Sequence, residues 1–126
     1  MKAVLDTSIV LADDVAPLPG ELAISAATIA ELHFGVLVAG SNQVRAERLR
    51  RLMFLQRRLT SLPIDDAVAA SYGQLAAAVV AAGRQPRARI MDLLIAATAH
   101  AHGAALYTRN LDDFTGLEAL IDIRAS

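Results

Sequence analysis

Residues 1–12 read MKAVLDTSIVLA, a short apolar run that is followed at once by an aspartate. The run KAVL (2–5) has the length and composition of a buried β-strand. Asp6 interrupts it, and no other charged residue occurs in 3–12. The chain therefore begins with a predicted buried strand whose end carries a lone carboxylate.

Further apolar runs along the chain predict short strands, and longer segments predict helices. The helices are bounded by residues typical of helix caps, namely Ser25 and Asp65 before them and Gly40, Gly83 and Gly103 after them. Strands that alternate with helices predict an α/β fold, a three-layer α/β/α domain with a mainly parallel sheet that helices cover on both faces. No repeat or long linker divides the sequence, so we expect a single domain over 1–126. The expected strands are 21–24, 62–64 (a strand or a connector), 104–107 and 120–123, and the expected helices are about 26–39, 42–59, 65–83 and 89–102.

Composition excludes several classes of protein. The chain has 126 residues, 55% hydrophobic and 20% charged, with a formal net charge of −1. No stretch reaches the roughly 18 apolar residues of a membrane span, and a chain this apolar with so little net charge is not intrinsically disordered. With no cysteine, a disulfide scaffold, a cysteine-ligated zinc site and thiol catalysis are excluded. Because the first apolar run is too short for a signal peptide, we expect a cytoplasmic protein with no membrane partner.

Two more carboxylates stand alone in apolar elements. Glu31 is the only charged residue of 22–44 and Asp92 the only one of 90–108, with histidine counted as neutral. Each acid has an ordinary explanation by itself: Asp6 as a helix N-cap, Glu31 facing water and Asp92 in the first turn of its helix. Burying an unpaired charge is costly, however, and one shared cause explains all three. That cause is either an arginine, of which only Arg89 is near, or a divalent cation, since Mg²⁺ and Mn²⁺ prefer oxygen ligands.

A further acidic pair follows a predicted strand near the C-terminus. The segment TRNLDDF (108–114) places Asp112 and Asp113 directly after the strand expected at 104–107. Taken alone, such a pair is typical of a solvated turn. Ligands of an open α/β sheet gather at the carboxyl ends of its strands, and Asp6 also follows a strand. We therefore expect one of these two aspartates to lie near Asp6.

Four motifs together resemble a PIN domain, and more narrowly the VapC toxins of bacterial and archaeal toxin–antitoxin modules. They are LDTSIVL (5–11), S-x-x-T-x-x-E-L (25–32), D-x-x-I-A-A-T-A (92–99) and T-R-N-x-x-D-F (108–114). Their order and spacing cover almost the whole chain, which is more specific than any one motif.

The resemblance implies a PIN-like fold and a metal-dependent endoribonuclease that hydrolyses RNA. Asp6 and Asp92 would be the main ligands of Mg²⁺ (or Mn²⁺), and Glu31 and Asp113 would complete the catalytic site or hold metal-bound water. Asp112 stands beside Asp113, so the sequence leaves open which of the two faces the metal. The groups expected to orient ligands or water around this site are the hydroxyls of Thr7, Ser8 and Thr108, the amide of Asn110, and Asp112.

Arginines gather in two segments, 45–58 and 84–89. Arg87 and Arg89 are the predicted substrate-binding residues because they directly precede the helix that carries Asp92, and contacts to phosphates would give affinity without base specificity. For the segment 45–58, contact with RNA, docking of an antitoxin and a solvated helix face all remain open.

The resemblance also implies partners, namely an RNA substrate (tRNA, rRNA or mRNA), a cognate VapB-type antitoxin and a second copy of the chain in a homodimer. The alternative is a non-catalytic PIN-like module that binds RNA or protein. All four acidic positions are filled, which favours catalysis. A phosphatase or phospho-acceptor site is disfavoured, because the segment LDTS (5–8) lacks the second aspartate that such sites carry.

Overall fold

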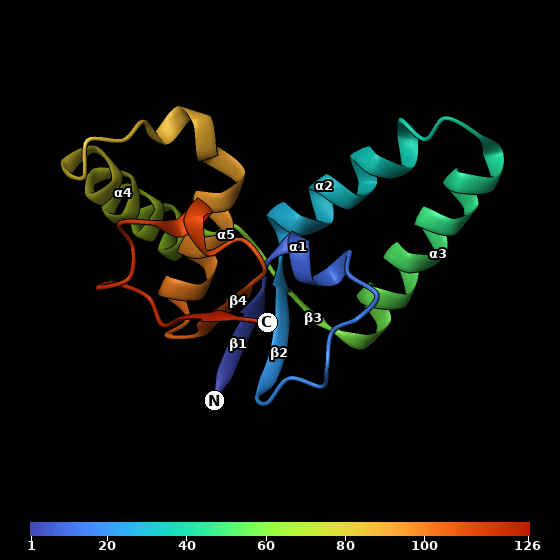
Figure 1. Cartoon of the computed structure of the whole chain (residues 1–126), viewed down its shortest axis with the longest axis horizontal. Helices are drawn as coiled ribbons and strands as arrows, with labels where there is room; N and C mark the ends of the chain where they lie inside the picture. Colours follow the sequence, from blue (N-terminus) through green and yellow to red (C-terminus); the bar gives the residue numbers. More distant parts are fainter.

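The computed structural model describes residues 1–126, which form a five-stranded sheet with helices on both of its faces (Figure 1). The strand order is β3-β2-β1-β4-β5, and every neighbouring pair is parallel. The expected α/β class is confirmed, and the sheet is wholly parallel. The strands are β1 (Lys2–Leu5), β2 (Glu21–Ser25), β3 (Thr60–Leu62), β4 (Ala105–Thr108) and β5 (Ile123–Ala125).

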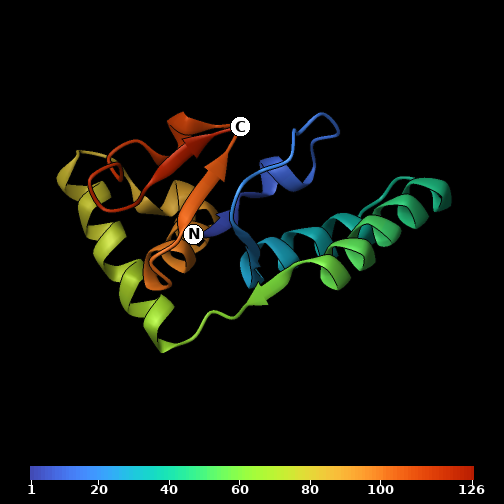
Figure 2. The same ribbon diagram turned by 90° about the horizontal axis from the view of Figure 1, so that it is seen from below.

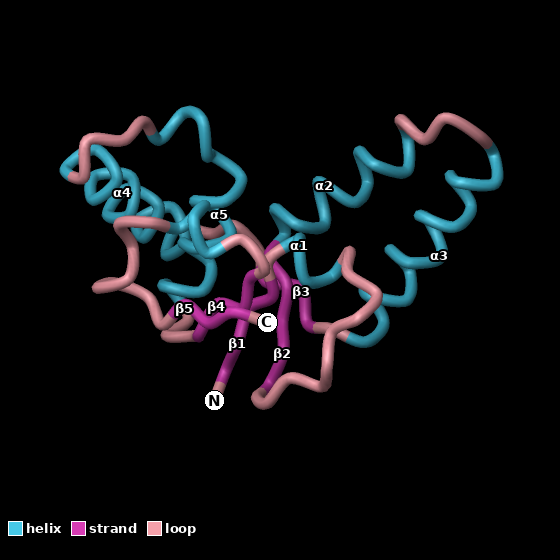
Figure 3. Tube along the Cα trace, in the orientation of Figure 1, coloured by secondary structure: helices cyan, strands magenta, loops and turns pink.

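Two pairs of helices extend from the sheet on opposite sides. Figures 1 and 2 show α2 and α3 as an antiparallel pair that projects outward, with α4 and α5 together on the other side. Figure 3 shows the long connection between α1 and β2 as a loop that lies beside α3. No helix combines the length and the apolar character that crossing a bilayer requires. The helices are α1 (Thr7–Val10), α2 (Ala26–Leu37), α3 (Asn42–Arg58), α4 (Asp66–Ala81) and α5 (Ile90–Ala101), with 3₁₀ turns η1 (Pro86–Arg89) and η2 (Leu111–Phe114).

Alternate residues of the central strands supply the two sides of the core, because side chains along a strand point to opposite faces of the sheet. Val4 and Leu106 pack in a buried cluster with residues of α4 and α5. Leu5 and Tyr107 belong to a separate cluster on the other face, with Ile9 of α1. The sheet therefore lies between two helical layers, as the alternation of predicted elements indicated.

The strand order creates a crevice at the carboxyl ends of β1 and β4. The chain leaves β1 toward β2, and it leaves β4 toward β5, in opposite directions along the sheet. Such a reversal is where ligands bind in open α/β sheets. Asp6 follows β1 directly and Thr108 ends β4, so both lie at this crevice.

Most predicted boundaries hold within two or three residues, and the differences have local causes. Gly83 (φ 79°) and Gly103 (φ 60°) end α4 and α5 in left-handed conformations, as expected. The expectation that Gly40 ends α2 is wrong: α2 ends at Leu37, and no positive φ occurs at Gly40. Pro63 has no N–H to donate, so β3 lies before it rather than at 62–64. The last strand begins at Ile123, because 117–121 form a turn in which the N–H of Leu120 bonds the carbonyl of Leu117.

Candidate active site

Four carboxylates from separate elements meet at the carboxyl edge of the sheet. Asp6 follows β1, Glu31 lies in α2, Asp92 in the first turn of α5, and Asp113 in η2 after β4. The charges of Asp113, Asp6 and Glu31 each raise the pKa of Asp92. The structure thus brings together the four acids that the motifs singled out.

Asp6 is buried and held by two hydroxyl groups. Its Oδ2 atom accepts hydrogen bonds from Ser8 Oγ at 2.6 Å and from Thr108 Oγ1 at 3.0 Å, and only 4% of the residue is exposed. Although Asp6 precedes α1, its side chain makes no capping hydrogen bond. The ordinary explanation of this carboxylate as a helix N-cap is therefore wrong.

The two hydroxyls are themselves oriented by the loop after β4. Ser8 Oγ accepts from the backbone N–H of Arg109 at 3.1 Å, and Thr108 Oγ1 accepts from the backbone N–H of Asn110 at 2.9 Å. Each hydroxyl thus accepts from the backbone with a lone pair and donates its own proton to Asp6. Asn110 thus contributes through its main chain rather than through the amide that the sequence singled out.

Glu31 is half-buried and tied to α1. Its Oε1 atom accepts from Thr7 Oγ1 at 2.8 Å, and Thr7 Oγ1 lies 3.1 Å from Thr28 Oγ1. Thr7 has only one hydroxyl proton, so Thr28 is the donor in the second contact. Thr28 is fully buried and lies one turn before Glu31. Thr28 is the threonine of the S-x-x-T-x-x-E-L motif, but we expected no role for it from the sequence, although its spacing of three residues puts it on the same helix face as Glu31.

Asp92 forms no side-chain hydrogen bond, unlike the other three acids. Its pKa is raised from 3.8 to about 6, first by burial and then by the charges of Asp113, Asp6 and Glu31, while Arg89 lowers it. The first turn of a helix normally favours a carboxylate. Here burial and the neighbouring acids outweigh that effect.

The structure distinguishes the two adjacent aspartates of η2. Asp113 Oδ1 accepts from Arg89 Nη1 at 3.1 Å, and its charge has the largest effect of any charge on the pKa of Asp92. The Asp112 side chain is exposed and forms no hydrogen bond, whereas its backbone carbonyl accepts from Arg84 and Thr115. Asp113 is therefore the aspartate that faces the other acids.

The predicted basic residues lie in different settings. Arg89 is half-buried beside Asp113, while Arg87 is exposed and forms no hydrogen bond or ion pair. On α3, Arg48 donates to the carbonyl of Gly35 at 2.7 Å, and Arg51 donates to the carbonyl of Val10 at 3.1 Å. Both line a cleft of about 290 Å³ that Glu31 also lines. The sequence did not separate these two arginines from the rest of 45–58.

The donor atoms fit a hard divalent cation. The acids supply only carboxylate oxygens, which Mg²⁺ and Mn²⁺ prefer. Burial raises the pKa of Asp92 most, and a bound cation would relieve the repulsion among the acids that raises it further. In this conformation no three acidic or histidine side chains converge closely enough to hold one ion directly.

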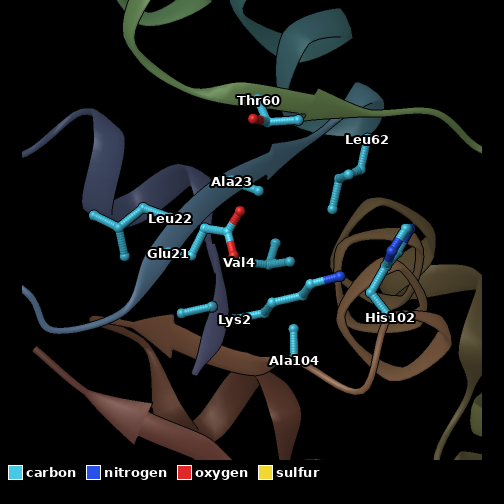
Figure 4. Close-up of a pocket in the computed structure, with 10 residues that line it drawn as sticks. Lys2, Val4, Glu21, Leu22, Ala23, Thr60, Leu62, His102 and Ala104 are labelled. Carbon is cyan, nitrogen blue, oxygen red and sulfur yellow. The ribbon is translucent and has the colours of Figure 1, made fainter.

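A small cavity of about 120 Å³ lies at the opposite edge of the sheet (Figure 4). Lys2 and Glu21 begin β1 and β2, and Thr60 begins β3, so the cavity lies at the amino ends of the strands. Figure 4 shows His102 on one side of it. It shares no lining residue with the acid cluster.

A wholly parallel α/β/α domain with acids gathered at the β1 and β4 ends is a domain of the PIN type. The PIN domain family matches residues 3–118, and the chain belongs to that family. Among curated relatives, Ribonuclease VapC5 of Mycobacterium tuberculosis is 36% identical over 95% of this chain and 90% of its own length. Ribonuclease VapC8 of the same species is 39% identical over 75% of this chain and 88% of its own length. Within the PIN family, the chain therefore belongs with the VapC ribonucleases.

Solved structures agree with this assignment. The complex VapBC-5 from Mycobacterium tuberculosis contains a chain with a TM-score of 0.84 and 35% identity, covering 98% of this chain and 96% of that one. VapBC2 from Rickettsia felis, solved with a DNA fragment from the promoter, gives a TM-score of 0.82 at 25% identity, covering 100% of this chain and 99% of that one.

Proposed function

We propose that this chain is a metal-dependent endoribonuclease and the toxin of a VapBC-type toxin–antitoxin module. The observation that carries the proposal is the placement of Asp6, Glu31, Asp92 and Asp113 at the carboxyl edge of the sheet. The effect of the other three acids on the pKa of Asp92 supports it. Its relatives are named ribonucleases, and its structural neighbours were solved as VapBC complexes.

Asp6 and Asp92 would be the main ligands of Mg²⁺ or Mn²⁺, with Glu31 and Asp113 completing the site or holding water. When bound, such a cation activates the attacking water and offsets the charge that grows on the phosphate oxygens. Hydrogen bonds within the protein orient Asp6, Glu31 and Asp113 before any cation binds. Ser8 and Thr108 donate to Asp6, which fixes the direction of its carboxylate.

Glu31 and Asp113 are each positioned by one polar neighbour. Thr7 donates to Glu31, and the Arg89 guanidinium donates to Asp113. Each bond occupies one carboxylate oxygen and leaves the other free to contact a ligand or its water. Asp92 has both oxygens free of side-chain hydrogen bonds, which suits a residue that contacts the cation directly.

The substrate in this proposal is RNA, whether tRNA, rRNA or mRNA. Arg89 already lies beside Asp113, and Arg87 is exposed two residues earlier with no protein partner. We assign both to phosphates of the bound strand, since arginine donates to phosphate oxygens in a forked geometry.

The partner in this proposal is a VapB-type antitoxin, because the structural neighbours were solved as VapBC complexes. On this chain, Phe34 and Leu37 of α2 and Phe54 of α3 are more than half exposed, at 66%, 75% and 54%. Phe34 and Leu37 are three residues apart on one face of α2, and exposed apolar patches mark protein interaction sites. Co-expression with a small adjacent reading frame tests the pairing: the two chains should copurify, and separate elution would contradict it. We also retain a homodimer as the expected state of the chain, to be measured by light scattering.

The experiment for the activity is an incubation with total RNA. The wild-type protein should cut RNA with Mg²⁺ and stop when EDTA is added. Asp6→Asn should keep the circular dichroism spectrum of the wild type and lose cleavage, because the replacement removes a ligand charge but little volume. Cleavage by Asp6→Asn at the wild-type rate would remove Asp6 from the site. Binding without any cleavage by the wild type would favour the alternative, a non-catalytic PIN-like module.

A further inference from the structure

A cleft between α1, α2 and α3 adjoins the acid cluster. It has a volume of about 290 Å³, and its lining includes Thr7 and Glu31 on one side and Arg48 and Arg51 on the other. Thr7 donates to Glu31, so the wall of the cleft and the acid site share these two residues. Whatever occupies the cleft therefore lies next to the proposed reaction centre.

The two arginines are aimed by the backbone of the facing elements. They are three residues apart on α3, which places them on one face of that helix. Arg48 Nη1 donates to the Gly35 carbonyl of α2 at 2.7 Å, and Arg51 Nη1 donates to the Val10 carbonyl of α1 at 3.1 Å. Holding a long side chain in place before binding lowers the entropy cost of binding.

The charge of this pair is poorly compensated by the protein. Arg48 forms no ion pair. Its guanidinium has five N–H donors, and only Nη1 donates a hydrogen bond to the protein. Arg51 pairs with Asp13 at 2.9 Å, but the Asp13 side chain is 89% exposed. Water screens a pair of this kind, so its neutralising effect is small. The arginine side of the cleft is therefore positively charged.

Gly35 forms part of the α2 wall of the cleft. Its carbonyl accepts the hydrogen bond from Arg48, and a Cβ atom built on it would meet no heavy atom within 4 Å.

From these contacts we infer that Arg48 and Arg51 bind a backbone phosphate of the RNA strand, next to the phosphodiester that is cut. The inference rests on the proposed ribonuclease function and adds a phosphate site on the α3 side of the acids. A phosphodiester matches the site because its two non-bridging oxygens accept a bidentate pair of hydrogen bonds from a guanidinium group. Glu31 would repel any anion placed on the acid side of the cleft, so the phosphate belongs at its arginine side.

An acidic segment of a protein partner is the competing occupant. Continuity with the acid site favours RNA, since a strand that crosses the acids must place its next phosphates one nucleotide away on either side. A carboxylate-bearing peptide has no such reason to reach Glu31.

The test compares Arg48→Ala with Arg57→Ala. Arg57 lies on the same helix, is exposed, forms no hydrogen bond or ion pair and does not line the cleft, so it controls for the lost charge. Binding of a mixed-sequence single-stranded RNA is measured in EDTA over a range of salt concentrations. Cleavage of the same RNA with Mg²⁺ then gives kcat and KM separately, and thermal unfolding confirms that each variant is folded.

Arg48→Ala should weaken RNA binding several-fold and reduce the slope of log affinity against log salt by about 0.7, the value for one lost contact to a single strand. Its KM should rise while kcat stays near that of the wild type, and Arg57→Ala should match the wild type. Arg48→Lys should restore the salt slope but only part of the affinity, because it keeps the charge and loses the fork.

Equal effects of Arg48→Ala and Arg57→Ala on RNA binding would overturn the inference. So would an Arg48→Ala variant that binds RNA normally but fails to copurify with the antitoxin, since the cleft would then serve the protein partner. A wild-type protein that neither binds nor cuts RNA would instead contradict the proposed function itself.

Discussion

Asp92 is the residue at which the needs of folding and of the site conflict. It lies in a largely buried helix, has no hydrogen-bond partner and experiences the charges of three other acids. Its neighbours Leu93 and Ile95 are buried in the core, so the helix cannot turn to expose it. A charged carboxylate at this position therefore favours binding of a cation, and it destabilises the protein when no cation is bound.

The first prediction concerns stability and pH. The pKa of Asp92 is about 6 in the folded chain, against an ordinary value of 3.8, so the folded state holds this proton more tightly than the unfolded state. Stability therefore falls as Asp92 ionises between about pH 4 and pH 6, and stays lowered above that range. In EDTA, Asp92→Asn should melt at a higher temperature than the wild type at pH 8, and the difference should shrink at pH 4.5. Asp112→Asn is the control, and an Asp92→Asn protein with no gain at pH 8 would contradict this explanation.

The second prediction separates the two adjacent aspartates. Asp113→Asn should lower kcat/KM by at least about tenfold, the usual scale for a group that supports a metal site. Asp112→Asn should stay within about twofold of the wild type, because the exposed Asp112 carboxylate has no contact with the other acids. Steady-state cleavage of one RNA by both variants makes the comparison. An equal loss in the two variants would mean that the loop rearranges when it binds a ligand.

At the scale of single residues, the sequence predicted the four acids better than it predicted the residues that contact them. Lone carboxylates in apolar elements were visible because burial makes them costly, and parallel strands bring their carboxyl ends to one edge. The partners of Arg48 and Arg51 were not visible, since the carbonyls of Gly35 and Val10 become neighbours only when α3 folds back along α2. The contact of Thr28 with Thr7 likewise depends on how α1 meets α2.

Among the elements, helix ends were predictable where one residue decides them. Gly83 and Gly103 adopt positive φ, which glycine allows at little cost, and they end α4 and α5 where expected. Gly40 failed as a signal because it lies in the short link before Ser41, whose side chain already caps α3. The four-residue elements α1 and η2 are too short to show a helical period, so the sequence did not predict them.

The third prediction uses two glycines of these helices. Gly73 lies inside α4 with ordinary backbone angles and free space around it. Gly73→Ala should therefore raise the free energy of unfolding by about 0.5 to 1 kcal/mol. Gly103→Ala should lower it by about 1 kcal/mol, because its φ of 60° strains any residue with a Cβ atom. Urea denaturation measures both changes, and a loss of stability in Gly73→Ala would contradict the packing described for α4.

In the whole molecule, a net charge of −1 conceals a clear separation. The acids gather at the centre, with Arg48 and Arg51 beyond Glu31 and with Arg89 beyond Asp113. An RNA strand that crosses the acids would thus meet arginines on both sides. This arrangement explains how a nearly neutral protein can hold a polyanion at an acidic site.

The fourth prediction follows from that arrangement. Arg87→Glu should weaken RNA binding and flatten its dependence on salt, because the exposed Arg87 has no protein partner to lose. Its effect should add to that of Arg48→Ala, since the two residues lie on opposite sides of the acids. Filter binding at several salt concentrations measures both effects. Unchanged affinity and salt slope in Arg87→Glu would remove this residue from the path of the substrate.

The most direct test of the central claim, that the four acids form a divalent-cation site, is calorimetric titration of Mn²⁺ into the metal-free protein. The wild type should bind Mn²⁺ saturably, and Asp6→Asn should bind it at least about tenfold more weakly. Equal Mn²⁺ affinity in the two proteins would contradict the claim.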